Sequence, residues 1–356
     1  MFKKLVSCAL VCSLILSFVC SCSSDQGKQG LNLQKFTESY IEYFDTGCTV
    51  VGYEESQEEF DAVCESIETQ LAEYNRLYDI YKSYEGINNI RTINKNAGVS
   101  PVVVDKKIID LIDFSAELYN TTGGTVNIAM GSVLSIWHDY REKYVGSDET
   151  PEIPSMDKLQ AAAKHTNFDD IIIDREKSTV FLRDADMILD VGAVAKGYAT
   201  EQIAQSLIAD GVSHYALNFG GNIRTIGTKN DGSDWSAAVT NPDKESEKAY
   251  LMKIKLRDQT FVTSGSYERF YTVDGVRYHH IIDPKTLMPN NTFTSVSILA
   301  NDSGLADVLS TALFNLTYEE GKAIIEKLNG VEAVWVTAEN EILYSKNFES
   351  IILEKY

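Results

Sequence analysis

The chain has 356 residues, of which 52 are acidic and 32 are basic, so its formal net charge is −20. The acidic balance, without a basic stripe or interleaved aromatic residues, argues against nucleic acid as a partner. It also means that an anionic ligand needs local help from a metal ion or a helix N-terminus.

The N-terminus is predicted to be a targeting segment. Lys3 and Lys4 precede an apolar run over residues 5–19 that is too short to span a membrane. The run ends in VCSC, which resembles the lipobox of bacterial lipoproteins and implies that Cys22 carries a lipid in the mature protein. An ordinary secretory signal is the alternative, and both predict export. With the lipid, the protein is anchored to the outer face of the bacterial cell membrane or inner membrane.

These features divide the chain into a signal peptide over residues 1–21, a polar, flexible tether over 22–34 and a folded region over 35–356, in one or two lobes. Four of the six cysteines lie in residues 8–22. In an exported protein the other two, Cys48 and Cys64, either pair as a disulfide or serve as small buried residues, and the sequence leaves both open.

Apolar periodicity predicts the structural elements in chain order. The first half has a strand over 46–53, a helix over 58–77, an irregular surface stretch over 78–96, a helix over 105–119, a glycine-rich stretch over 121–137 and a loop over 144–154. The second half has strand, turn and strand over 171–191, a helix from 195, strands over 215–219, 235–240, 251–256, 260–262 and 294–299, helices over 305–314 and 318–328, and a closing hairpin. Regular βαβ alternation is missing, which favours an α+β fold.

The stretch DVGAVAKGYAT, residues 190–200, follows the predicted strand MILDVG, which delivers Asp190 to its end. Gly192 permits a sharp turn, and small and aliphatic residues then recur every four positions along a helix. The free N–H groups of that helix start face whatever lies over the turn. The order of residues fits neither a P-loop nor a dinucleotide-binding loop. A tight turn that serves only packing is the alternative.

Two further stretches carry candidate site residues. In ALNFGGNIRTIG the adjacent Gly220 and Gly221 interrupt an apolar strand, which indicates a bulge or a close approach of backbone to a ligand. In TSGSYERFYTVDGVRYHHIIDP the alternation of a strand sends His279 and His280 to opposite faces. One of the two has the chemistry of a general base, and a hydrogen-bonded core histidine is the alternative.

The stretch NDSGLADVLSTALFNL predicts a helix with Asp307, Ser310 and Thr311 on one face, at positions i, i+3 and i+4. Their hard oxygen donors suit Mg²⁺, completed by ligand phosphates and water, better than Zn²⁺. A capped helix with solvated polar groups is the alternative.

Taken in order, DVGAVAKGYA, LNFGGN, TSGSYERFY with HHIIDP, and ADVLSTALF resemble the ApbE family, the FAD:protein FMN transferases. The stretches TGCTV and TGGTVNIAMGSVLSIW are similar to two more of its motifs, so the resemblance spans nearly the whole mature chain. It implies a T-fold-related α+β architecture with largely antiparallel sheets flanked by helices.

The resemblance also implies a Mg²⁺-dependent enzyme that transfers the FMN half of FAD to a threonine or serine hydroxyl of a flavoprotein and releases AMP. The implied acceptor is an electron-transport subunit of the Rnf/Nqr type or a related extracytoplasmic flavoprotein. The implied metal ligands are the Ala193 carbonyl, Asp307 and Thr311, with Ser310 as a further candidate. The implied base is His280.

The implied FAD contacts come from five parts of the chain, and they are Thr46, Tyr81, Thr125, Val126, Asn127, Asp190, Lys196 and Ile281. This chain departs from the family at two positions. It has Asn127 where the family often has Asp or Pro, and it has Ser132 where the family often has Pro. These departures affect the flavin contacts and leave the metal and base positions intact.

Two other functions are alternatives, and the first of them uses the same residues. A Mg²⁺-dependent FAD pyrophosphatase would put water in place of the protein hydroxyl and yield FMN and AMP. A non-enzymatic flavin-binding or solute-binding lipoprotein has no need of a metal site, so the oxygen donors around Asp307 argue against it. A Ser/His hydrolase is disfavoured because the sequence has no GxSxG stretch.

Overall fold

The computed structural model describes residues 33–356. The predicted signal peptide, the lipidation site Cys22 and nearly all of the predicted tether therefore lie outside the described residues. Within the described residues, no helix combines the length and the apolar character needed to cross a membrane.

The central element is an antiparallel eight-stranded sheet with the order β1-β2-β6-β7-β10-β13-β14-β15. Its strands are β1 (Gln34–Tyr43), β2 (Thr46–Glu54), β6 (Tyr215–Phe219), β7 (Asn222–Ile226), β10 (Thr260–Gly265), β13 (Phe293–Ala300), β14 (Glu332–Thr337) and β15 (Ile342–Tyr344).

Three smaller antiparallel sheets surround it. One is the hairpin of β11 (Phe270–Val273) and β12 (Val276–His279), the second is β16 (Ile352–Lys355), β9 (Tyr250–Leu256) and β8 (Trp235–Thr240), and the third is β3 (Val102–Val103), β5 (Thr179–Leu182) and β4 (Ile171–Asp174).

The helices are α1 (Gln57–Tyr78), α2 (Ile90–Lys95), α3 (Lys106–Thr121), α4 (Gly131–Tyr144), α5 (Met156–Ala162), α6 (Ala195–Ala209), α7 (Ser303–Phe314) and α8 (Tyr318–Ile325). Three short 3₁₀ turns lie at η1 (Ala163–His165), η2 (Phe168–Asp170) and η3 (Phe348–Ile351).

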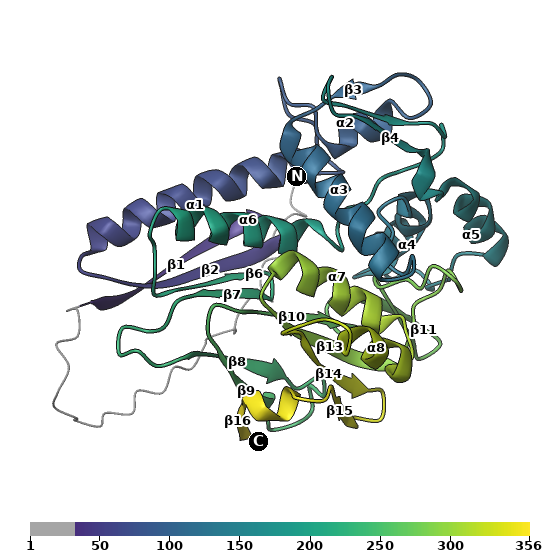
Figure 1. Cartoon of the computed structure of the whole chain (residues 1–356). Coiled ribbons are helices and arrows are strands. Elements are labelled where there is room, and N and C mark those ends of the chain that lie inside the picture. Colours follow the sequence, from purple (N-terminus) through teal and green to yellow (C-terminus); the bar gives the residue numbers. More distant parts are fainter. Residues whose placement is uncertain (1–32) are drawn as a thin grey trace. The chain divides into compact units, whose positions relative to one another are not determined.

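Both faces of the central sheet are covered. Helices α1, α6 and α7 pack on one face, where Phe60, Ile203 and Leu309 are completely buried. The sheet of β8, β9 and β16 covers the other face and buries Trp235 and Ile254. Figure 1 shows the helices on one side of the long sheet and the small sheet on the other. Because burial of apolar surface is the main favourable term in folding, these two layers fix the sheet and the helix ends above it.

A third apolar cluster joins α4 to the β11–β12 hairpin. The Trp137 ring stacks on Tyr278 with 5.8 Å between ring centroids, and its Nε1 donates to the Leu287 carbonyl at 2.9 Å. The hairpin is thus held against α4, and it ends with His279, directly followed by His280.

The predicted α+β architecture, with antiparallel sheets flanked by helices, is confirmed. Residues 33–356 group into a single compact unit. The predicted helical face of α6 is also confirmed, since every fourth residue along it is buried: Ala195, Ala199, Ile203 and Leu207.

Three local predictions were wrong. The stretch 78–96 contains the helix α2 and buries Asn89, Ile90 and Ile93, since Asn89 caps that helix with its side chain. The stretch MILDVG is no strand, because it pairs only through an isolated bridge between Ile188 and Met130. The two glycines of LNFGGN form the tight turn between β6 and β7, with positive φ at both positions, and not a bulge, while the close approach of this backbone to a ligand stays a prediction.

Candidate functional site

Two helices meet at the predicted metal site, and a glycine sets the distance between them. A Cβ atom at Gly197 of α6 would lie 2.4 Å from the Asp307 Cβ and 2.4 Å from the Ser303 carbonyl oxygen of α7. Without a Cβ, the helices approach closely enough for the Gly197 amide to donate to Asp307 Oδ2 at 2.7 Å. The second glycine of DVGAVAKGYAT is therefore a packing requirement of this site.

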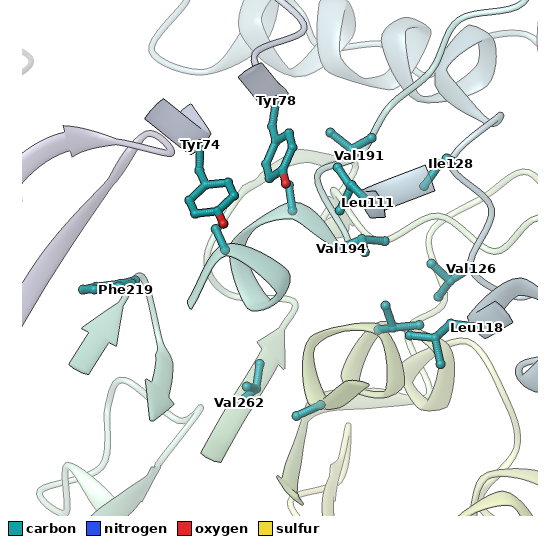
Figure 2. Close-up of a cluster of buried hydrophobic side chains, with 14 of the residues drawn as sticks. Tyr74, Tyr78, Leu111, Leu118, Val126, Ile128, Val191, Val194, Phe219 and Val262 are labelled. Carbon is teal, nitrogen blue, oxygen red and sulfur yellow. The ribbon is translucent and has the colours of Figure 1, made fainter. Parts of the chain in front are cut away.

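The turn before α6 is held by two buried valines. Val191 and Val194 flank the more exposed Gly192 and Ala193, and Figure 2 shows both valine side chains within the buried cluster. In a regular helix the Gly197 amide would bond to the Ala193 carbonyl four residues earlier. Because that amide bonds to Asp307 instead, the Ala193 carbonyl accepts no hydrogen bond from any residue that the structure describes.

The buried Asp307 carboxylate has one committed oxygen and one available oxygen. Oδ2 accepts from the Gly197 amide and from Asn222 Nδ2, the latter at 3.1 Å. Oδ1 lies 3.8 Å from Lys196 Nζ, and within residues 33–356 it accepts no hydrogen bond. An available carboxylate oxygen beside a single distant ammonium group is a suitable ligand for a cation.

The two predicted hydroxyl ligands on α7 differ in burial and in whether the protein already binds their hydroxyl groups. Ser310 is completely buried, and its Oγ donates to the Asp307 carbonyl at 2.8 Å and lies 2.7 Å from Ser264 Oγ. Thr311 is half-buried, and its hydroxyl has no hydrogen-bond partner in the described part of the chain. The structure thus leaves Thr311 free to bind a ligand and commits Ser310 to the protein.

The available oxygens of Ala193, Asp307 and Thr311 fit a hard divalent cation, because a carbonyl, a carboxylate and a hydroxyl are the ligand types that Mg²⁺ takes. A different group of possible ligands, made up of His165, Asp184 and Asp186, brings three donor atoms within 4.8 Å of one another. None of the predicted metal residues belongs to that group, and its histidine is already paired with Asp184 at 2.8 Å.

The two histidines at the end of β12 have different roles in the structure. His279 is buried, with Nε2 3.0 Å from the Asn290 carbonyl and Nδ1 accepting from the Ile281 amide at 3.1 Å. A carbonyl can only accept, so Nε2 carries the proton and both ring nitrogens are committed. His279 is the hydrogen-bonded core histidine that was one of the alternatives.

His280 is the histidine with a free ring nitrogen. Its Nδ1 lies 3.3 Å from the Arg269 carbonyl, which places the proton on Nδ1 and leaves Nε2 as an acceptor. Burial, followed by the charges of Arg269, His279 and Arg141, lowers the pKa of His280 to about 3. The ring is therefore neutral at physiological pH, as proton acceptance requires.

Tyr81, His138 and Asp190 come from separate segments and lie near one another. The ring of Tyr81 lies 5.1 Å from that of His138 on α4. Burial and the neighbouring Asp190 carboxyl raise the pKa of Tyr81 to about 12. Burial raises the pKa of Asp190 even though the Gly192 amide donates to its Oδ1 at 2.9 Å. Tyr81 and Asp190 are thus neighbours, and the turn with Ala193 lies next to them.

Most of the remaining predicted FAD contacts lie close to that turn or to the histidines. The Asp190 amide donates to the Ile128 carbonyl at 2.8 Å, which places the segment of Thr125, Val126 and Asn127 next to it. Thr125 and Asn127 bond to neighbouring carbonyls, those of Thr122 and Thr166, both at 2.9 Å. Ile281 is buried directly after His280, and Thr46 lies against Gly220, where a Cβ would be 2.5 Å from its Cγ2.

The sequence profile of the ApbE family matches residues 44–335, which is most of the chain. The chain belongs to the ApbE family. It is 34% identical over 267 residues to a protein of Treponema pallidum named FAD:protein FMN transferase, and the match covers 71% of this chain and 72% of that one. A protein of Haemophilus influenzae with the same name is 26% identical and is matched over 92% of this chain and 91% of its own length.

Solved ApbE structures share the fold. The crystal structure of the ApbE protein of Thermotoga maritima superposes with a TM-score of 0.76 at 27% identity, covering 89% of this chain and 99% of that one. The flavin transferase ApbE of Vibrio cholerae superposes with a TM-score of 0.75 at 23% identity, covering 90% of this chain and 99% of its own.

In this ApbE chain, the motif LNFGGN supplies a site residue that the sequence analysis missed. Asn222, its last residue, donates from Nδ2 to Asp307, while its Oδ1 lies 3.4 Å from Lys196 Nζ. The amide thus orients the carboxylate and the ammonium together. The sequence feature that could have identified Asn222 is its position directly after the two glycines of the turn. This position makes it the first residue of β7.

A buried ion pair in this ApbE chain was missed as well. Arg224 of β7 donates from Nε to Glu201 of α6 at 2.9 Å, and the same carboxylate accepts from the Ser303 amide at 2.9 Å. Glu201 thereby joins α6, β7 and the start of α7. Because a buried carboxylate is costly unless it is paired, this contact fixes the position of α7 and of Asp307 on it.

Proposed function

We propose that this protein transfers the FMN half of FAD to a threonine or serine hydroxyl of a flavoprotein and releases AMP, in a Mg²⁺-dependent reaction. The observation that carries the proposal is the set of available oxygens at the junction of α6 and α7, provided by Ala193, Asp307 and Thr311. The names of the family's relatives support the same reaction, since they are FAD:protein FMN transferases.

Ala193, Asp307 and Thr311 would hold Mg²⁺, and Ser310 would support them through its bond to the Asp307 carbonyl. When bound, the ion supplies positive charge that offsets the FAD pyrophosphate and the charge that develops on the leaving AMP. Lys196 and the N-terminus of α6 add positive potential at the same place. An overall charge of −20 makes such local compensation necessary.

His280 accepts the proton of the acceptor hydroxyl. The hydroxyl oxygen forms a bond to the FMN-side phosphorus while the bond from that phosphorus to the AMP oxygen breaks, and the proton passes to Nε2 of His280. The Nδ1 proton bonds to the Arg269 carbonyl, so the ring is fixed in the tautomer that the reaction needs. A hydroxyl is a poor nucleophile without such a base.

The flavin and its ribityl chain would lie along the surface that Tyr81 and Asp190 form. Thr46, Thr125, Val126, Asn127, Lys196 and Ile281 complete the proposed set of FAD contacts. An FAD molecule there would bring its pyrophosphate over the turn with Ala193. The departure at Asn127 would change the flavin contacts and not the metal ligands.

The cellular location of the reaction is inferred from the sequence of the N-terminal segment. We propose export, with a lipid on Cys22 that anchors the protein to the outer face of the cell membrane or inner membrane. The acceptor would then be an extracytoplasmic flavoprotein domain, of which an electron-transport subunit of the Rnf/Nqr type is one example.

Mass spectrometry tests the proposal directly. The protein is incubated with FAD, Mg²⁺ and candidate acceptor domains, and the acceptors are examined for an adduct with the mass of FMN less water. An adduct on threonine or serine is the expected result. Release of FMN and AMP from FAD without an adduct on any acceptor would instead favour the pyrophosphatase. Binding of FAD without any turnover would contradict both enzyme functions.

A further inference from the structure

Arg141 on α4 is a partly buried guanidinium group with unused hydrogen-bond donors. Its side chain is 14% exposed. One Nη donates to His138 Nδ1 at 2.9 Å, and Nε lies 3.9 Å from the exposed Glu142 carboxylate. Across residues 33–356 the group makes no other hydrogen bond or ion pair. A guanidinium carries five N–H donors, so Arg141 keeps several of them for a ligand.

His138 adds a donor at the same place. A guanidinium can only donate, so His138 Nδ1 must accept, and the ring proton therefore lies on Nε2. The ring also packs against that of Tyr81 in a tilted arrangement, with 5.1 Å between centroids, which holds its orientation. The structure thus fixes one imidazole N–H beside the unused guanidinium donors.

A second guanidinium lies near the first. Arg269 is exposed, and its side chain has no acidic partner among the residues that the structure describes. Its carbonyl contacts both the backbone amide of His280, at 3.1 Å, and the ring of His280, at 3.3 Å. Burial lowers the pKa of Arg141, and the positive charge of Arg269 lowers it further.

The acidic groups nearby do not balance these charges. Asp190 and Glu142 are the carboxyl groups that interact with Arg141, and burial raises the pKa of Asp190, which disfavours its charged form. Glu142 is 66% exposed, so water screens its charge. Two guanidinium groups that repel each other in a chain of net charge −20 indicate a site that an anion completes.

We propose that Arg141 and Arg269, together with His138, form an anion-binding pocket that holds the FAD phosphates beside His280. The inference rests on the proposed function, because it takes FAD as the ligand. Arginine suits this task, since its planar fork of donors matches phosphate oxygens. Arg141 interacts electrostatically with Asp190, which lies three residues before the proposed metal ligand Ala193, so the same pyrophosphate would contact both the pocket and the metal ion.

Anion binding here has a consequence for the base. The charges of Arg269 and Arg141 hold the pKa of His280 down in the free protein, after burial. A bound phosphate offsets these charges and raises the pKa of His280 towards its usual value. His280 would therefore become a stronger base only when FAD is in place.

Equilibrium binding without Mg²⁺ tests the pocket. Flavin fluorescence is titrated with the wild-type protein, R141Q, R141K and R269Q, using FAD and the phosphate-free riboflavin as ligands. We expect R141Q and R269Q to weaken FAD binding about 10- to 100-fold, with riboflavin binding changed less than about 2-fold. R141K should recover part of the FAD affinity because it keeps the charge.

Arg175→Gln is the matched control, since Arg175 is an exposed arginine that pairs with Asp113. This variant should bind FAD like the wild type. Circular dichroism shows whether R141Q is folded, and R269Q tests the pocket independently because Arg269 is exposed.

Two results would overturn the pocket: unchanged FAD affinity in both R141Q and R269Q, or equal weakening of FAD and riboflavin. A rise in KM for the acceptor with unchanged FAD affinity would also overturn it, and would place an acidic group of the acceptor there. Absence of FMN transfer by the wild-type protein would remove the proposed function without altering these binding measurements, so the two failures are distinguishable.

Discussion

Substitution of Gly197 by alanine tests whether the contact between α6 and α7 controls the proposed metal site. The new Cβ would lie 2.4 Å from both the Asp307 Cβ and the Ser303 carbonyl oxygen. Backbone and Cβ atoms cannot rotate away, so α7 must move by about 1 Å to restore ordinary contact distances. The bond from the Gly197 amide to Asp307, now 2.7 Å, would then be lost.

The size of the effect follows from two opposing terms. Overpacking costs about 1–3 kcal/mol, and the higher helix propensity of alanine offsets about 1 kcal/mol of it, so we expect a net loss of about 0–2 kcal/mol in the free energy of unfolding. Activity should suffer more than stability. A catalytic group displaced by about 1 Å lowers turnover by about 100-fold.

The assay measures FMN transfer as a function of Mg²⁺ concentration, together with thermal unfolding. Gly321→Ala in α8 is the matched control, because its Cβ would meet the Leu313 and Trp335 side chains at 3.1 and 3.3 Å and not a backbone atom. Gly321→Ala should keep wild-type turnover and Mg²⁺ dependence. Wild-type turnover in Gly197→Ala, at the wild-type Mg²⁺ requirement, would refute the reasoning.

Three other predictions concern the site and its histidines. His280→Gln should slow transfer by about 10²- to 10⁴-fold while FAD binding stays within about 3-fold, so an unaltered transfer rate would exclude His280 as the base. Asp307→Asn should abolish Mg²⁺-dependent turnover, as a chelator does for the wild type, whereas Asp186→Asn should retain it; the reverse pattern would move the metal site to the group with His165. His279, buried with a pKa lowered from 6.5 to about 4, binds a proton more readily when unfolded. Its contribution to stability, about 3 kcal/mol, should therefore be present above pH 6.5 and be lost as the pH falls to about 4. Denaturant unfolding at both pH values should show a smaller pH-dependent loss for His279→Gln than for the wild type, and equal losses would contradict this assignment.

Periodicity made the arrangement of several candidate site residues predictable. Helical spacing put Asp307, Ser310 and Thr311 on one face, and strand alternation separated His279 from His280. Both patterns are local, since they depend on the repeat of a single element. The motif order then indicated the family, which the comparisons confirm.

Contacts between distant elements were not predictable from these patterns. The bond from Asn222 to Asp307 joins residues 85 positions apart, and the Arg224 to Glu201 pair joins a strand to a helix. The partial burial of Arg141 was equally hard to predict, because a charged residue on a helix usually faces solvent. Arg141 lies on α4, which packs against the β11–β12 hairpin, and no repeat within a single element predicts its partial burial.

The most direct test of the central claim counts AMP and attached FMN in the same reaction. The protein is incubated with FAD, Mg²⁺ and an acceptor flavoprotein domain, AMP is quantified by chromatography, and acceptor-bound FMN is quantified by mass spectrometry. FMN transfer predicts one attached FMN for each AMP released, with both products lost in Asp307→Asn. AMP release matched by free FMN, or attached FMN that does not depend on Asp307, would contradict the account.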